Sequence, residues 1–202
     1  MIGLSIILSY RYWSPQQLLL GNVKPAITTK FSLKNAPSDS LQGFIATMSG
    51  NVTWLSRTSS KPVQLKSRQS IQQGEEISTG TNGQVVVRVQ NEASLLLHPN
   101  THVSIVQLLP QNFVFIQDKG SVHYENTIQV PISIKSFDLA TIIIKGFVTL
   151  SADPKNQTVS VSVEKGSVKE GYEDSQNTSN VVTVNPGQTF VFDETNKIGT
   201  IQ

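Results

Sequence analysis

The chain has 202 residues, with no cysteine, 16 Lys and Arg against 14 Asp and Glu, and only 15% charged residues. The lack of cysteine excludes disulfides, thiolate zinc sites and a thiol nucleophile, and a net charge of +2 is too small for a nucleic-acid-binding surface. Val and Ile together number 38 against 6 Ala. Because branched side chains pack well in strands, this composition favours an all-β fold.

Residues 1–34 form an N-terminal arm that is apolar and basic. The run Met1–Tyr10 is apolar, and residues 1–38 contain four basic side chains and no acid. Ten apolar residues are too few for a membrane-spanning helix, which needs about 20, and no basic residue precedes the run as in a secretory signal. Two interpretations stay open: a partly ordered remnant of a signal or membrane anchor, which would tether the protein, and a stray strand.

A small, polar, Pro-containing linker at 35–41 separates this arm from a β domain that we place at 42–202. Within the domain, short alternating segments are separated by turn residues roughly every 8–12 positions, which is typical of layered β folds. We predict many short, mainly antiparallel strands in a two-sheet sandwich or β-roll. The clearest strand is 159–164, where Val at each odd position alternates with a polar residue.

Three local features predict how the strands are arranged. Segments 84–90 and 142–150 are almost continuously apolar, so we expect central strands that are buried on both faces. Pro131 lacks an N–H, so the strand around it should lie at a sheet edge or a bulge. The pair Asn82-Gly83 favours a type I′ hairpin turn before the strand that follows.

The histidines predict no metal or catalytic site. His98 and His102 are four residues apart, which would put both rings on one face of a helix, but Pro99-Asn100 lies between them and the flanking segments read as strands. His123 alternates with apolar residues and should face solvent or a partner, without the nucleophile and acid of a catalytic triad. We therefore predict turn or surface histidines, no cofactor, and a protein that is not an enzyme.

One basic segment is the candidate binding surface. Four cations lie within twelve residues without an acid, whereas residues 164–194 carry six acids and two lysines. Such polarity would orient the domain on a charged partner, or it represents two solvated loops. Trp54 lies beside the basic segment and is either an exposed aromatic anchor or ordinary core. The tentative binding residues are Trp54, Arg57, Lys61, Lys66 and Arg68.

Several phrases, most of which contain a glycine, follow one another in a recognisable order. They are Gly50-Asn51-Val52, Gln73 to Gly80, Gly83 before a valine-rich strand, Leu95 to Thr101, Lys119 to Val122, Glu164 to Val168 and Asn185 to Gln188. Over residues 43–193 the chain resembles the FecR domain, a periplasmic β module. The glycines that match the family's turns are Gly50, Gly74, Gly80, Gly83, Gly120, Gly146, Gly166 and Gly187. Where the family has Arg-Gly-Thr, this chain has Lys145-Gly146-Phe147, so a role tied to that Arg and Thr is not expected.

The resemblance implies a non-catalytic domain in the bacterial periplasm or cell envelope, exported or tethered to the inner membrane. Its implied work is to recognise an envelope protein in signalling. We expect it to lack the cytoplasmic sigma-factor-binding domain and the C-terminal transporter-contacting domain of the family's regulators. Two alternatives stay open: binding of cell-wall carbohydrate or peptidoglycan through Trp54 and the amide side chains, and a stiff structural spacer.

Overall fold

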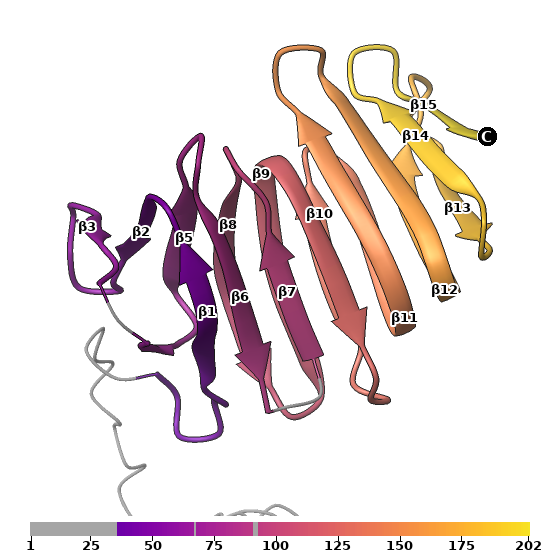
Figure 1. Ribbon diagram of the computed structural model, residues 1–202. Helices are drawn as coiled ribbons and strands as arrows, with labels where there is room; N and C mark the ends of the chain where they lie inside the picture. Colours follow the sequence, from indigo (N-terminus) through magenta and orange to yellow (C-terminus); the bar gives the residue numbers. More distant parts are fainter. Residues whose placement is uncertain (1–35, 67, 91–92) are drawn as a thin grey trace, which may run out of the picture. The chain divides into compact units, whose positions relative to one another are not determined.

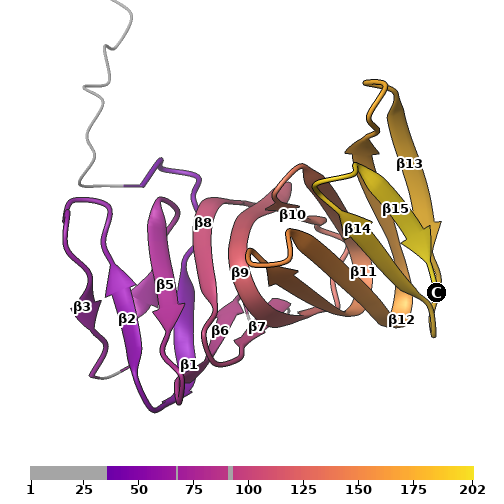
Figure 2. The same cartoon turned by 90° about the horizontal axis from the view of Figure 1, so that it is seen from above.

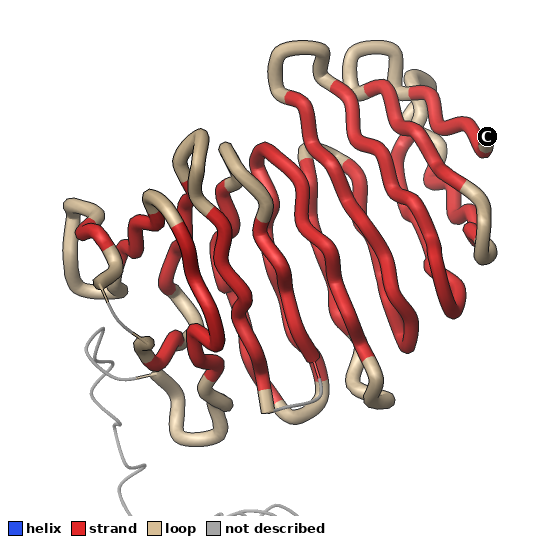
Figure 3. The backbone as a smooth tube through the Cα atoms, viewed as in Figure 1, coloured by secondary structure: helices blue, strands red, loops and turns tan. Residues whose placement is uncertain are grey.

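The computed structural model describes residues 36–66, 68–90 and 93–202. These residues form fifteen strands and no helix, so the predicted all-β fold is confirmed (Figures 1 and 3). The described part of the chain accordingly has no helix that is long and apolar enough to cross a membrane. The arm 1–34 lies outside the described residues, and its targeting role, like the proposed domain boundaries, stays a prediction.

The strands form one continuous hydrogen-bonded sheet that is folded into two facing layers, as the view from above shows (Figure 2). Layer A contains, in order, β3 (Val63–Gln64), β2 (Val52–Leu55), β5 (Glu75–Thr79), β8 (His102–Leu109), the first half of β9 (Asn112–Asn126), β10 (Ile132–Ser136), the first half of β11 (Leu139–Asp153), the second half of β12 (Thr158–Glu173) and β13 (Ser179–Val184). Layer B contains β4 (Ser70–Ile71), β1 (Gly43–Ser49), β6 (Gln84–Val89), β7 (Ala93–Leu97), the other halves of β9, β11 and β12, then β14 (Thr189–Asp193) and β15 (Ile198–Ile201). Among the described strands, only β9 and β10 pair in parallel.

The three longest strands, β9, β11 and β12, each belong to both layers because they bend at a glycine. β9 bends near Gly120, while β11 and β12 bend side by side, with Gly146 and Gly166 in register. At Gly166 φ is +81°, and an added Cβ would lie 2.1 Å from the carbonyl oxygen of Lys145. A Cβ at Gly146 would lie 2.2 Å from the carbonyl oxygen of Lys165. Both positions therefore require glycine.

The core lies between the layers and is built from alternate residues of each strand. Val159, Val161 and Val163 are buried, as their alternation predicts. Strands β6 and β11 are paired on both sides, so the prediction that they are central is confirmed. The prediction that they are buried on both faces is wrong, because each layer has one face toward solvent. Ile142 and Ile144 of β11 are accordingly 39% and 47% exposed.

Two other local predictions are also wrong. In both cases, pairing with strands that are distant in sequence determines where the segment lies in the sheet. Strand β10 is not at an edge, since it pairs with β9 and β11. Pro131 immediately precedes the strand, where its missing N–H costs no ladder bond, and its carbonyl accepts from Phe113 N at 3.0 Å. Asn82-Gly83 does not make a hairpin, because β5 and β6 lie in different layers and do not pair. Neither residue has a positive φ.

Buried amide side chains hold the bends in place. The Nε2 group of Gln117 donates to the carbonyl oxygens of Gly120 and Leu150 at 2.9 and 3.0 Å, and Tyr124 donates its hydroxyl hydrogen to Gln117 Oε1. Beside the bend of β11, where Asn126 is in register with Gly146, Asn126 Nδ2 donates to the carbonyl oxygens of Val130, Ile143 and Ile144. These bonds satisfy carbonyl groups that the bending strands would otherwise leave unpaired.

Candidate functional site

The predicted basic segment forms one end of both layers. We call residues 57–71 the basic edge segment. It contains β3, an edge strand of layer A, and β4, an edge strand of layer B. Lys61, Lys66 and Arg68 are exposed, and so is Val63 of β3, at 51%. Three of the four predicted cations therefore surround an edge strand whose outer hydrogen-bonding groups are not paired within the described sheet.

Arg57, the fourth cation, is placed differently. Its side chain lies against Gly74, with Nε 3.1 Å from the point where a Cβ would be. Its Nη1 atom is buried and has no hydrogen-bond partner among the described residues. The glycine at position 74 leaves room for the guanidinium, so Arg57 contributes to the packing of the segment more than to its surface.

Trp54 is not the exposed aromatic anchor that the sequence allowed. Its ring is half-buried against the core, and its Nε1–H donates to Glu75 Oε2 at 3.0 Å. The same carboxylate oxygen accepts from the backbone N–H of Gln72 at 2.9 Å, and Glu75 is buried. The indole thus fastens β2 to β5, and its one hydrogen-bond donor is already used within the fold.

Two of the three histidines, His102 and His123, lie in polar clusters on the outer faces of the layers. His102 Nδ1 is 2.7 Å from Ser78 Oγ, and its Nε2 is 3.3 Å from Asp118 and 3.6 Å from Glu76. The pairing of β5 with β8 places Ser78 opposite His102, a register that local sequence could not supply. Both residues project from the outer face of a sheet, and their contacts fix the ring between three strands.

Of the other two histidines, His123 lies in a similar cluster, whereas His98 is placed by its backbone bonds. His123 is 3.0 Å from Thr149 Oγ1 and is flanked by Glu125 and Glu164 at 3.7 and 3.6 Å. His98 is half-buried and its backbone N–H bonds to Ser121 O. Within the described ranges, no three His, Asp or Glu side chains are arranged to hold a metal ion.

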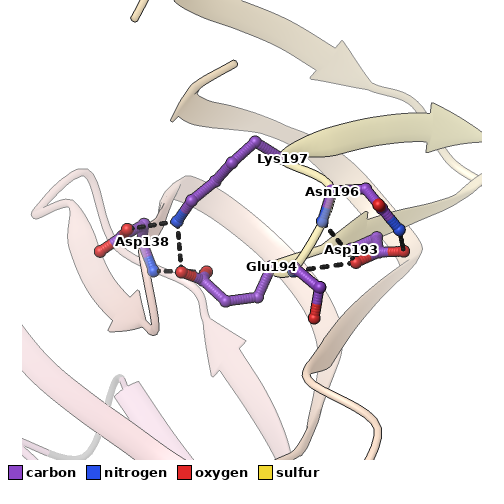
Figure 4. Close-up of polar contacts among 6 residues, drawn as sticks. Asp138, Asp193, Glu194, Asn196 and Lys197 are labelled. Carbon is purple, nitrogen blue, oxygen red and sulfur yellow. Dashed lines mark hydrogen bonds and ion pairs between the residues drawn. The ribbon is translucent and has the colours of Figure 1, made fainter. Parts of the chain in front are cut away.

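A polar hollow of about 620 Å³ lies at the tips of the β10–β11 and β12–β13 hairpins, and includes Tyr172, Asn180 and Lys197. Lys197, in the β14–β15 turn, bridges Asp138 and Glu194 and so joins a hairpin of layer A to a hairpin of layer B (Figure 4). The hydrogen bond from Lys197 lowers the pKa of Asp138. Sequence alone gave no signal for this bridge, because its partners are 59 residues apart.

A buried acid lies deeper, between the layers. Glu170 is fully buried, and this burial raises its pKa to about 8. Thr141 donates its hydroxyl hydrogen to Glu170 Oε2 at 2.6 Å, whereas Oε1 has no partner among the described residues. The alternation of β12 resumes after the Gly166 bend with Val168 and Glu170 facing inward. Without knowledge of the bend, this inward position could not be predicted.

Comparison with known proteins supports the fold. The sequence matches no protein-family model and no curated protein. Its structure is similar to two crystal structures, at 2.50 and 1.65 Å resolution, of a candidate anti-sigma factor from Parabacteroides distasonis. The TM-score is 0.55 for both, with 15% and 14% identity, over 63% of this chain and 58% of that chain. At this level of identity, the likeness establishes a shared fold.

Proposed function

We propose that this chain provides a non-catalytic, FecR-like recognition domain in the bacterial envelope, and that its partner is a protein in a regulatory pathway. The fold shared with the candidate anti-sigma factor supports the regulatory class. The order of the glycine phrases from Gly50 to Gln188 supports the FecR-like type. Placement in the periplasm and tethering through the arm 1–34 belong to the same proposal.

One observation carries the choice of recognition surface: the basic edge segment puts two edge strands and three exposed cations at one end of the domain. An edge strand can accept an extended partner segment through backbone hydrogen bonds. Surrounding charges steer association and suppress partners of the same sign. We therefore expect a partner with an acidic, extended segment.

The experiment is site-specific photo-crosslinking in the source bacterium. A photoreactive residue is placed at Lys66, at Val63 or, as the control, at the exposed Lys155 in the turn between β11 and β12. We expect one envelope protein to crosslink from the two positions in the basic edge segment and not from the control. The triple variant Lys61→Glu, Lys66→Glu, Arg68→Glu should abolish that crosslink.

A matched variant keeps this test interpretable. Lys119→Glu, Lys135→Glu, Lys155→Glu makes the same change in net charge at exposed lysines elsewhere and should leave the crosslink intact. Equal crosslinking from all positions, or equal loss of the crosslink in both triple variants, would contradict the proposal.

Export is tested separately by fusing alkaline phosphatase to the C-terminus, since this enzyme is active only after export. An inactive fusion would contradict the periplasmic placement.

A further inference from the structure

A second hollow, of about 610 Å³, lies where β11 and β12 bend together, far along the chain from the basic edge segment. Its volume is within the usual range of about 300–1,000 Å³ for ligand sites. The facing residues Gly146 and Gly166 are both among the residues that line it. Ile144, which is 47% exposed, and the ring of Phe147 provide an apolar lining.

The rim of this hollow is basic and its charges are not neutralised. Lys145 and Lys165 line it, and within the described residues neither forms an ion pair. Lys165 Nζ lies 5.3 Å from the centre of the Phe147 ring, a cation–π contact that holds the ring at the rim. The neighbouring acids, Glu125 and Glu164, contact His123 instead.

The apolar and basic positions continue beyond the hollow along the outer face of layer A. Ile142 is 39% exposed and is in register with the exposed Lys169. Exposed side chains on β12 therefore recur at Lys165, Ser167 and Lys169, which is the two-residue spacing of an extended chain. A compact anion would need only the hollow, whereas an extended ligand with the same period would use both the hollow and this track.

We call the hollow and the track from Lys165 to Lys169 together the groove. We propose that this groove binds an extended acidic peptide whose carboxylates alternate with aliphatic side chains. The carboxylates would pair with Lys145 and Lys165, and an aliphatic side chain would cover Ile144 and the two glycines. Charge complementarity with an unpaired basic rim argues for an acidic segment. The proposal rests on the proposed protein-recognition function and assigns a second contact surface to it.

The direct test is fluorescence anisotropy of the purified protein with a labelled heptapeptide of alternating glutamate and valine, at low salt. We expect saturable binding that weakens with added salt. The lysine–valine counterpart should not bind. Lys145→Gln with Lys165→Gln should weaken binding at least tenfold, and Ile144→Ser should weaken it without a change of charge. Lys119→Gln with Lys155→Gln, which makes the same charge change at exposed positions elsewhere, should have no such effect.

Several results would overturn the inference. One is an equal loss of peptide binding in the two double variants, and another is equal affinity for the glutamate–valine and lysine–valine peptides. The third is binding of phosphatidylglycerol vesicles that depends on Lys145 and Lys165, without binding of the acidic peptide. Thermal melting must show that each variant remains folded. If the heptapeptide fails to bind while the crosslink at Lys66 persists, the groove is wrong and the recognition function stands. If the crosslink fails while the heptapeptide binds, the basic edge segment is not the recognition surface and the groove stands.

Discussion

The hydroxyl of Thr141 donates a hydrogen bond of 2.6 Å to the carboxyl group of Glu170, and both side chains are completely buried between the two layers. Strands β11 and β12 place the two residues opposite each other in register. Burial disfavours the charged carboxylate and raises the pKa of Glu170 to about 8, while the Thr141 bond opposes this shift. The core therefore contains an acid that is protonated at neutral pH.

This acid predicts an unusual dependence of stability on pH. Between pH 4.5 and about 8 the folded protein retains a proton that the unfolded chain releases, so the free energy of unfolding should fall as pH rises through this window and level off above it. Each pKa unit of difference corresponds to about 1.4 kcal/mol. Urea titrations across the window would measure the fall.

Replacing Glu170 provides the control for that titration. Glu170→Gln has nearly the same shape and no titrating proton, so its free energy of unfolding should stay level over the window and exceed that of the wild type at the alkaline end. Parallel curves for the two proteins would show that Glu170 does not titrate as its burial predicts.

Removing the hydroxyl group of Thr141 should lower the stability of the fold, whereas Glu170→Gln should raise it at alkaline pH. Thr141→Val leaves the Glu170 carboxyl without a hydrogen bond among the described residues, and a buried polar group left unsatisfied costs about 1–3 kcal/mol. Because the bond lowers the pKa of Glu170, its loss should also move the alkaline end of the window to higher pH. Thr183→Val, on the exposed face of β13, should do neither. Identical titrations for the two threonine variants would contradict this assignment.

The bend of β12 should not tolerate a side chain. Gly166→Ala puts a Cβ 2.1 Å from Lys145 O at a φ of +81°, so the strands must shift, and we expect a loss of more than about 2 kcal/mol in unfolding free energy. Gly171→Ala is the matched control in the same strand, since its nearest contact is 3.8 Å. It should be neutral or stabilising, because alanine loses less backbone entropy than glycine. Chemical denaturation of both variants decides the point, and equal stabilities would mean that the bend is not strained.

The pair of Trp54 and Glu75 should be energetically coupled. Trp54→Phe keeps an aromatic ring but removes the donor to Glu75 Oε2, and Glu75→Gln removes the charge that accepts the bond. Each single change should cost about 1–3 kcal/mol, and the double variant less than the sum of the two. A double-mutant cycle by urea denaturation measures the coupling, and simple additivity would show that the bond does not stabilise the fold.

The sequence supported the all-β class well because strand alternation is a local property: Val159, Val161 and Val163 are buried as their spacing required. Glycine phrases also marked real changes of direction. What they did not reveal is the kind of change, since Gly83 and Gly166 appear alike in sequence, yet one lies in a connection between strands and the other inside a continuous strand.

The candidate site was predicted less completely. Lys61, Lys66 and Arg68 are exposed as a basic run should be. The packing of Arg57 against Gly74 and of Trp54 against Glu75 depends on partners 17 to 21 residues away, and no local pattern encodes those distances. The groove at Gly146 was hidden for the same reason, because the residues that line it come from three separate parts of the chain that only strand pairing brings together.

The sharing of β9, β11 and β12 between the layers also determines how the domain can move. In an ordinary sandwich the two sheets are held together mainly by side chains and can slide or part. Here three covalently continuous strands cross from one layer to the other, so neither layer can open without breaking the hydrogen-bond ladders of both. The region from β9 to β12 should therefore exchange its amide hydrogens as a single slow unit, while β3, β4 and β15, each paired on one side only, exchange early. The central strands therefore form a rigid unit, whereas the edge strands open more easily. A force that a partner applies at one end would be transmitted through the continuous strands to both layers.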